Sequence, residues 1–196
     1  MYHDLPRTAT FWDFLYEVDR DLAETRRKPG CPCCRGRLDT SNYSRKPRGG
    51  PDNLPEAYRL RLSFCCDRDG CRKRVTPPSV RFLGRKVYLA AIVVLIGAMR
   101  QGPSPRRVRD LADRCGADPK TITRWQAFWR DLFPQTHFWK TARARIVPLI
   151  TLVALPYSLL DAFLGGGGDL SEGWQRLLRF LAPITIPGAL EIEVSS

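Results

Sequence analysis

The feature that most constrains this chain is a pair of cysteine clusters in a segment that has little else to hold it together. Six of the seven cysteines fall into the two clusters: Cys31, Cys33, Cys34, Cys65, Cys66 and Cys71. Residues 30–80 around them are rich in Gly, Pro and Arg and poor in aliphatic side chains. Such a segment cannot bury much apolar area, so it needs a cross-link in order to fold.

A structural zinc ion is the cross-link that we expect. The first 21 residues are acidic and aromatic and lack an apolar leader segment, so we expect a reducing, cytoplasmic location. Clustered cysteines in a reducing compartment favour a metal over disulfides. Zinc takes four tetrahedral ligands, and thiolates suit it well. Four thiolates would close the site, so this zinc would be structural and not catalytic.

The spacing of the cysteines suggests which four bind the metal. The predicted ligands are Cys31, Cys34, Cys66 and Cys71. A tight turn commonly supplies two ligands with two residues between them, which favours Cys34 over Cys33. Cys65 remains an alternative to Cys66, and Cys33 an alternative to Cys34. Gly36 follows the first pair and Gly70 lies between the cysteines of the second, at positions where a turn often needs a residue that tolerates positive φ.

A strand is predicted between the two pairs. Apolar residues alternate with polar ones over 58–64, which is the period of a half-buried strand. Arg59 and Arg61 would then lie on the exposed face as a stripe suited to phosphate contact. Many further basic residues interleave with this segment, among them Arg81. The alternative is that they form only a solvated face.

The net charge of +12 is concentrated in the middle of the chain. Residues 26–130 carry 25 basic and 8 acidic side chains, whereas residues 1–25 have a net charge of −4 and residues 131–196 of −1. A merely solubilising charge would be spread evenly. The concentration therefore favours a densely negative partner, and double-stranded DNA is our first expectation. The longest apolar run, 87–99, is too short for a membrane span, so no membrane partner is expected.

The rest of the chain has helical periodicity. It predicts an α+β, mainly α, protein in which a small β zinc ribbon is followed by a helix-turn-helix bundle and a helical C-terminal extension. The predicted helices are 10–24, 85–100, 105–115, 118–132, 136–146, 156–164 and 170–182. The predicted units are an N-terminal helix (1–29), the zinc ribbon (30–80), the helix-turn-helix domain (85–146) and the extension (147–196).

The helix pair at 104–132 carries the sharper functional signal. Ser104 and Asp118 are placed to cap helices that each open on a proline, and Gly116 permits the turn between them. The small residue Ala112 suits a steep helix crossing, with Cys115 as a core residue on the same face. A buried face is expected for the second helix, formed by Ile122, Trp125 and Trp129. The pattern resembles the helix-turn-helix of bacterial regulators, transposases and recombinases.

That resemblance implies that the second helix enters the major groove of DNA. Its outward residues would be Lys120, Thr121, Thr123 and Arg124, of which Arg124 and Lys120 could read guanine. On the preceding helix, Arg106, Arg107 and Arg109 would meet the DNA backbone. The basic join Arg72, Lys73 and Arg74, which leads from the ribbon toward the helices, could also lie along the backbone.

The C-terminal third has almost no net charge and is punctuated by prolines. Its helices either complete the core or offer an interface to a protein partner. A face of the last helix is expected to be core, formed by Trp174, Leu177, Leu178 and Leu181. No enzymatic activity is expected: the carboxylates after Arg130 have no strand context for a two-metal site, and neither His3 nor His137 is placed near the cysteines.

The order of the modules resembles the DNA-recognition front ends of bacterial transposases and accessory proteins of mobile elements, over residues 30–132. We therefore expect a nucleoid-associated DNA-binding protein with structural zinc that serves in transposition or transcription regulation. Two alternatives stay open. One is an RNA-binding or ribonucleoprotein subunit, and the other is a non-catalytic subunit of a transposase.

Overall fold

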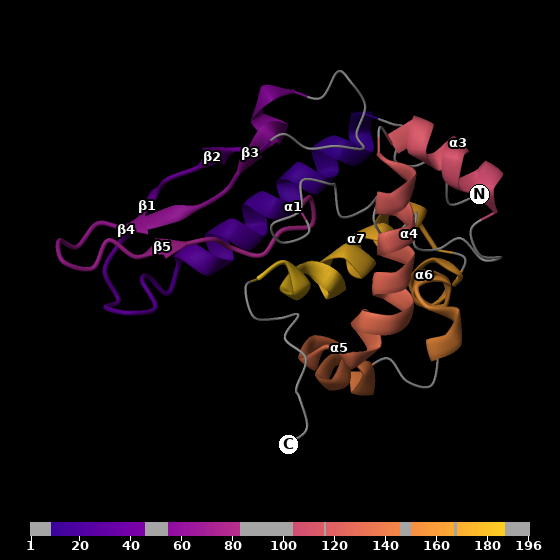
Figure 1. Cartoon of the computed structure of the whole chain (residues 1–196). Helices are drawn as coiled ribbons and strands as arrows, with labels where there is room; N and C mark the ends of the chain where they lie inside the picture. Colours follow the sequence, from indigo (N-terminus) through magenta and orange to yellow (C-terminus); the bar gives the residue numbers. More distant parts are fainter. Residues whose placement is uncertain are drawn as a thin grey trace.

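The protein is an α+β molecule that is mainly helical, as the sequence predicted (Figure 1). The computed structural model describes residues 9–45, 55–82, 104–115, 117–145, 150–166 and 168–186. The helix predicted over 85–100 lies outside these residues, as do Gly116 and the side chains of Arg107 and Cys115.

Short antiparallel strands form the β part, which projects from the helical body (Figure 1). One sheet has the order β1-β4-β5, formed by β1 (Leu38–Thr40), β4 (Phe64–Cys66) and β5 (Arg74–Val75). Its register pairs Leu38 with Cys66 and Phe64 with Val75. A second pair joins β2 (Tyr43–Ser44) to β3 (Leu60–Arg61). The hairpins bring the two cysteine clusters to the same end of this unit.

The continuous strand predicted over 58–64 is wrong in two respects. Tyr58 lies in the 3-10 helix η2 (Glu56–Arg59), and the strand is interrupted, because Leu62 and Ser63 between β3 and β4 belong to neither strand. Arg61 is 3% exposed and donates from Nη2 to the carbonyl oxygen of Pro77 at 2.6 Å. Burial lowers the pKa of Arg61, against the opposing effect of Asp19. The predicted arginine stripe is therefore absent at Arg61, because this guanidinium holds the chain instead of facing solvent.

The helices follow the predicted order among the described residues. The α-helices are α1 (Ala9–Arg27), α3 (Pro105–Cys115), α4 (Pro119–Ala127), α5 (His137–Ala142), α6 (Tyr157–Leu164) and α7 (Leu170–Leu181). Single wider or tighter turns connect them: the π-helix η3 (Phe128–Leu132) and the 3-10 helices η4 (Phe133–Gln135), η5 (Arg143–Arg145), η6 (Leu152–Ala154) and η7 (Ala182–Thr185). The helix predicted over 118–132 thus changes from α to π in its last turn.

Side-chain caps fix where three of these helices begin. The carboxylate of Asp118 accepts from the Lys120 amide at 2.8 Å, and Pro119 then opens α4, as predicted. Thr136 caps α5 and Asp169 caps α7 in the same manner. Each cap satisfies an amide that the helix itself leaves without a partner, which stabilises the helix by about 1 kcal/mol.

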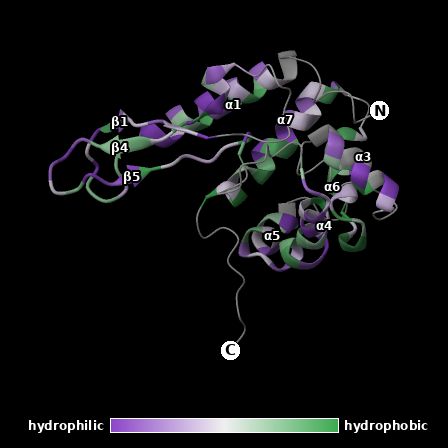
Figure 2. Cartoon of the chain, turned by 45° about the horizontal axis from the view of Figure 1, so that its top comes forward, coloured by the Kyte–Doolittle hydropathy of each residue, from purple (hydrophilic) through white to green (hydrophobic). Residues whose placement is uncertain are grey.

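A large core lies between the helices. The predicted buried faces of α4 and α7 are both confirmed: Ile122, Trp125, Trp129, Trp174, Leu177, Leu178 and Leu181 are all at most 3% exposed. Trp129, Phe133 and Trp139 pack successively in tilted ring contacts, with ring centroids 4.6 and 5.0 Å apart. Figure 2 shows that the visible side of α1 is largely hydrophilic.

Helix α1 takes part in two separate cores. Its N-terminal half contributes Trp12, Leu15 and Val18 to the helical core. Its C-terminal half contributes Ala23 to the small core of the β unit. At the end of the helix, the Nε of Arg27 donates to the carbonyl oxygen of Leu38 at 3.0 Å. One helix of 19 residues therefore connects the helical body to the cysteine-bearing strands.

A buried ion pair fastens the β unit to the middle of α1. Arg81 and Asp19 are both at most 1% exposed, and the Nε of Arg81 donates to the Asp19 carboxylate at 2.7 Å. The other Asp19 oxygen accepts from the Val80 amide at 2.6 Å. Arg81 also donates to the carbonyl oxygens of Tyr58 and Leu60, at 2.7 and 2.9 Å.

Aromatic rings enclose the same guanidinium. Its carbon lies 4.7 to 5.1 Å from the ring centroids of Tyr16, Tyr58 and Phe82. Cation–π attraction is strongest where water is excluded, as it is here. A fully buried charge is tolerated only where its partners are all in place. The arrangement therefore fixes one relative position of α1 and the segment that leaves the β unit.

We expect Asp19→Asn to destabilise the protein by about 3–5 kcal/mol, because it leaves the Arg81 charge buried without its counter-charge. Urea unfolding followed by tryptophan fluorescence measures this. Glu17→Gln is the matched control, since it removes an exposed carboxylate from the same helix and should change stability by less than about 0.5 kcal/mol. Equal effects of the two substitutions would contradict the role given to Asp19.

Candidate metal centre and nucleic-acid interface

Four thiols meet at the end of the β unit. Cys31, Cys34, Cys66 and Cys71 bring their sulfur atoms within 4.8 Å of one another. The Sγ atoms of Cys31 and Cys71 are 3.7 Å apart, and those of Cys34 and Cys66 are 3.5 Å apart. These are the four ligands that the sequence predicted, two from each cluster.

The donor set fits a tetrahedral metal ion. A metal–sulfur distance of about 2.3 Å in a regular tetrahedron places the sulfurs about 3.8 Å from one another, close to the distances found here. Cys31 and Cys66 are fully buried, whereas Cys34 and Cys71 are partly exposed. All four join the small core of the β unit, together with Leu38, Leu62, Phe64 and Val75. The four cysteines could therefore hold a metal ion that completes this core.

The other two clustered cysteines lie outside the four-thiol group. Cys33 is exposed at the tip of the first turn. Cys65 lies on β4 between the buried residues Phe64 and Cys66, and its Sγ is 3.4 Å from the carbonyl oxygen of Arg72. Because neighbouring strand residues point to opposite faces, Cys65 faces away from the group that Cys66 joins. The geometry thus separates the residues that spacing alone left as alternatives.

The two cysteine turns share a backbone conformation with positive φ. The residue after the second cysteine of each turn has positive φ: Arg35, at 60°, follows Cys34, and Arg72, at 42°, follows Cys71. In the first turn the amide of Arg35 donates to the carbonyl oxygen of Cys31 at 2.8 Å. Gly70 adopts positive φ as predicted, with a value of 81°.

Gly36 is required for a different reason from the one predicted. Positive φ in this turn belongs to Arg35, and Gly36 is not among the residues that adopt it. A Cβ at Gly36 would lie 3.1 Å from the Sγ of Cys66 and 3.3 Å from that of Cys34. The glycine therefore leaves room for the sulfur atoms instead of permitting an unusual backbone angle.

The thiols of the group differ in their readiness to ionise. Burial opposes ionisation of Cys31, but hydrogen bonds from the backbone of Cys33 and Cys34 and from neighbouring thiols outweigh it and lower its pKa to about 6. At Cys66 a backbone hydrogen bond from Arg68 favours ionisation, but burial and the neighbouring thiols outweigh it and raise the pKa to about 12. Crowded thiols compete for a single negative charge in this way, and a bound cation would relieve that competition.

A second set of candidate residues lies on α3 and α4, which pack together in the helical body. Lys120, Thr123 and Arg124 are exposed on α4, and Thr121 is partly exposed. Arg106 and Arg109 are exposed on α3. The predicted contact residues whose side chains are described therefore face outward, while Ile122 and Trp125 between them are buried.

The exposed cations on these helices are held mainly by their own backbone. The Nε of Arg124 donates to the carbonyl oxygen of Lys120 at 3.3 Å, and the Nε of Arg109 to that of Pro105 at 3.2 Å. Such contacts along one helix leave the charge in solvent. No ion pair is recorded for these cations among the described residues, in contrast with Arg130, which pairs with Asp131.

The predicted basic residues of the β unit differ in their exposure to solvent. Arg72 and Lys73 are exposed beside the second cysteine turn. Arg74 is also exposed, but it donates to the carbonyl oxygen of Ser41 and the hydroxyl of Ser63, at 3.0 and 3.1 Å. Arg81 is fully buried, so the prediction that it belongs to a solvent-facing basic set is wrong.

The sequence contained a sign of the Arg81 site that periodicity analysis passed over. Asp19 occupies the apolar stripe of α1, at helical spacing from Leu15 and Leu22. An acid on such a stripe needs a buried partner. Nothing local, however, identifies that partner as a residue 62 positions later in the chain.

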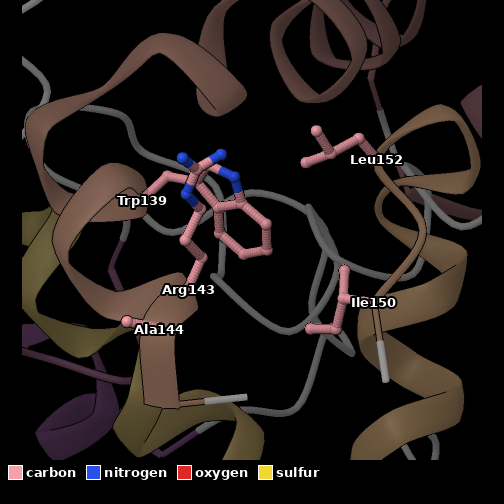
Figure 3. Close-up of a pocket in the computed structure, with 5 residues that line it drawn as sticks. All are labelled: Trp139, Arg143, Ala144, Ile150 and Leu152. Carbon is pink, nitrogen blue, oxygen red and sulfur yellow. The ribbon is translucent and has the colours of Figure 1, made fainter. Parts of the chain in front are cut away.

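A pocket of about 550 Å³ lies between α5, η5 and η6 (Figure 3). Its lining is Trp139, Arg143, Ala144, Ile150 and Leu152. Figure 3 shows the Arg143 side chain beside the Trp139 ring, with Ile150 and Leu152 on the other side. These lining residues include no acid, histidine or nucleophile, so the pocket is an apolar gap with one cation at its edge.

No protein-family model matches the chain, and neither the curated proteins nor the solved structures contain a significant match to it. Within the described part of the chain, none of the helices combines the length and the apolar character needed to cross a membrane.

We expect Gly36→Ala to weaken metal binding by the four thiols about tenfold or more, because the added methyl group displaces Cys66 or Cys34 from its position. Competition with a chromogenic chelator measures the affinity for Zn²⁺. Gly166→Ala is the matched control, since a Cβ there meets open space. An unchanged affinity in the Gly36 variant would refute the steric argument.

Proposed function

We propose that this protein binds double-stranded DNA through a helix-turn-helix formed by α3 and α4, and that a zinc ribbon built on the four cysteines supports it. The zinc ion would be structural. Four thiolates from two turns would close its coordination, and the ribbon has only a few aliphatic residues with which to form a core otherwise. In this proposal the protein recognises DNA and does not catalyse a reaction.

The single observation that carries DNA binding is the face of α4. Its polar residues near the N-terminus are exposed, while Ile122 and Trp125 on the opposite side of the helix are buried and anchor it in the core. A helix presented in this way suits the major groove, and its two cations form no ion pair with any residue that the structure describes. Arg124 has the fork of donors that reads guanine, and Lys120 suits a guanine or a phosphate. Arg106 and Arg109 on α3 would then contact phosphates, and Arg107 is proposed for the same role.

The module order suggests a process as well. A zinc ribbon followed by a helix-turn-helix suits the recognition step of transposition or of transcription regulation, in a bacterial nucleoid-associated factor. A protein partner would find a surface on the C-terminal helices, where Leu152 and Val153 are 44% and 95% exposed. An RNA-binding role is the competing outcome of the experiments below.

The zinc assignment is tested by two double variants. We expect about one zinc ion per chain in the purified protein, retained by Cys33→Ser with Cys65→Ser and lost by Cys31→Ser with Cys66→Ser. The first pair is the matched control, because it removes two thiols that lie outside the four-thiol group. Elemental analysis after exhaustive dialysis gives the ratio. Zinc retained without Cys31 and Cys66 would exclude this site.

The recognition helix is tested by selection from a random duplex library and titration of the enriched sequence. We expect Lys120→Ala with Arg124→Ala to weaken binding at least tenfold and to lower the slope of log K against log salt by no more than about 1, because only Lys120 is assigned a phosphate contact. The control is Lys140→Ala with Arg143→Ala, which removes the same charge from α5 and the adjoining 3-10 helix η5. Equal losses in both variants would indicate a general charge effect. Tighter binding to structured RNA than to any enriched duplex would contradict the proposed DNA target.

A further inference from the structure

The two basic surfaces lie at opposite ends of the molecule. One surface lies on α3 and α4 of the helical body. The other, with Arg72 and Lys73, lies in the β unit that extends away from that body (Figure 1). Figure 2, seen from another direction, shows the same separation. Helix α1 runs between the two, with its first half in the helical core and its last turn against the ribbon.

The spacing between these surfaces is set by a stiff element. Helix α1 has 19 residues and contains neither Gly nor Pro, so it is about 27 Å long. The buried contact of Asp19 with Arg81 fixes the ribbon segment to its middle, and Arg27 fixes its end. Helix α1 therefore holds the two surfaces at opposite ends of the molecule (Figure 1), at a separation on the order of its own length, which corresponds to about 8 base pairs of DNA.

The stretch between the surfaces does not favour DNA. The exposed acids of α1 are Asp13, Glu17, Asp21 and Glu24. Helix α1 carries five acids against three arginines, a net charge of −2, so it has no excess of positive charge to offer to a phosphate backbone. Contact with DNA is thus expected at the two ends and not along the connecting helix.

We infer that one molecule contacts one duplex at two separate places, the ribbon at one and α4 at the other, with centres about 8 or more base pairs apart. This rests on the proposed function and adds the layout of the target site to it. A spacing near 10 base pairs would bring both contacts to the same face of the duplex, which a rigid connector requires. The ribbon would supply phosphate contacts, and α4 the base contacts.

The experiment is hydroxyl-radical footprinting of the full chain on the enriched duplex, with three proteins compared. The wild-type protein should protect two patches. Arg72→Ala with Lys73→Ala should lose only one of them, and Lys120→Ala with Arg124→Ala only the other. Inserting 5 base pairs between the patches turns one to the opposite face, so affinity should fall at least tenfold, to that of a variant with a single contact.

Other outcomes are separable. A single continuous patch shorter than about 8 base pairs, or the loss of the same patch in both variants, overturns the two-contact layout while leaving DNA binding intact. Two patches that require two different duplex molecules, seen as a bridged complex on a gel, also overturn it. If no duplex is enriched or bound by the wild-type protein, the proposed function itself fails.

Discussion

The contact between Asp19 and Arg81 is the interaction on which the arrangement of this protein depends. It joins two segments that are 62 residues apart in the chain, and it lies where α1 passes from the helical core to the ribbon. Asp19 accepts from the side chain of Arg81 and from the amide of Val80, and Arg81 donates to the ribbon backbone as well. A pair with such complete hydrogen bonding can be buried without a large penalty, and it specifies one geometry. Hydrophobic contact alone would leave the ribbon freer to slide along α1.

The ribbon depends on a second constraint that acts locally. Its own apolar residues are few, and the four thiols take the place that larger side chains hold in an ordinary core. A metal ion at this position would convert four mutually repelling groups into a cross-link between the two turns. The space left by Gly36 beside two of the sulfurs belongs to the same design, because any side chain there would crowd the ligands. The ion pair of Asp19 with Arg81 positions the ribbon against α1, whereas the four-thiol group allows the ribbon itself to fold.

The distribution of positive charge has to be interpreted with these constraints in mind. A count of basic residues over 26–130 treats every arginine alike, yet Arg61 and Arg81 are buried and hold the backbone of the ribbon. Among the described residues, the exposed cations for which we propose DNA contact lie in two groups, at the second cysteine turn and on α3 and α4. Their separation follows from α1 and not from the sequence distance between them.

The sequence by itself determined the mainly helical α+β class, the cysteine pairs, and the buried faces of α4 and α7. These features are local: helical period, capping residues and ligand spacing are written in short stretches of chain. The choice of Cys34 and Cys66 over their neighbours was decided by the turn and by strand alternation, which place Cys65 on the far side of β4. The division of the predicted strand, the burial of Arg61 and the pairing of Asp19 with Arg81 were decided only by tertiary structure. Each depends on partners distant in sequence, and local period assigns a charged residue to solvent unless such a partner is known.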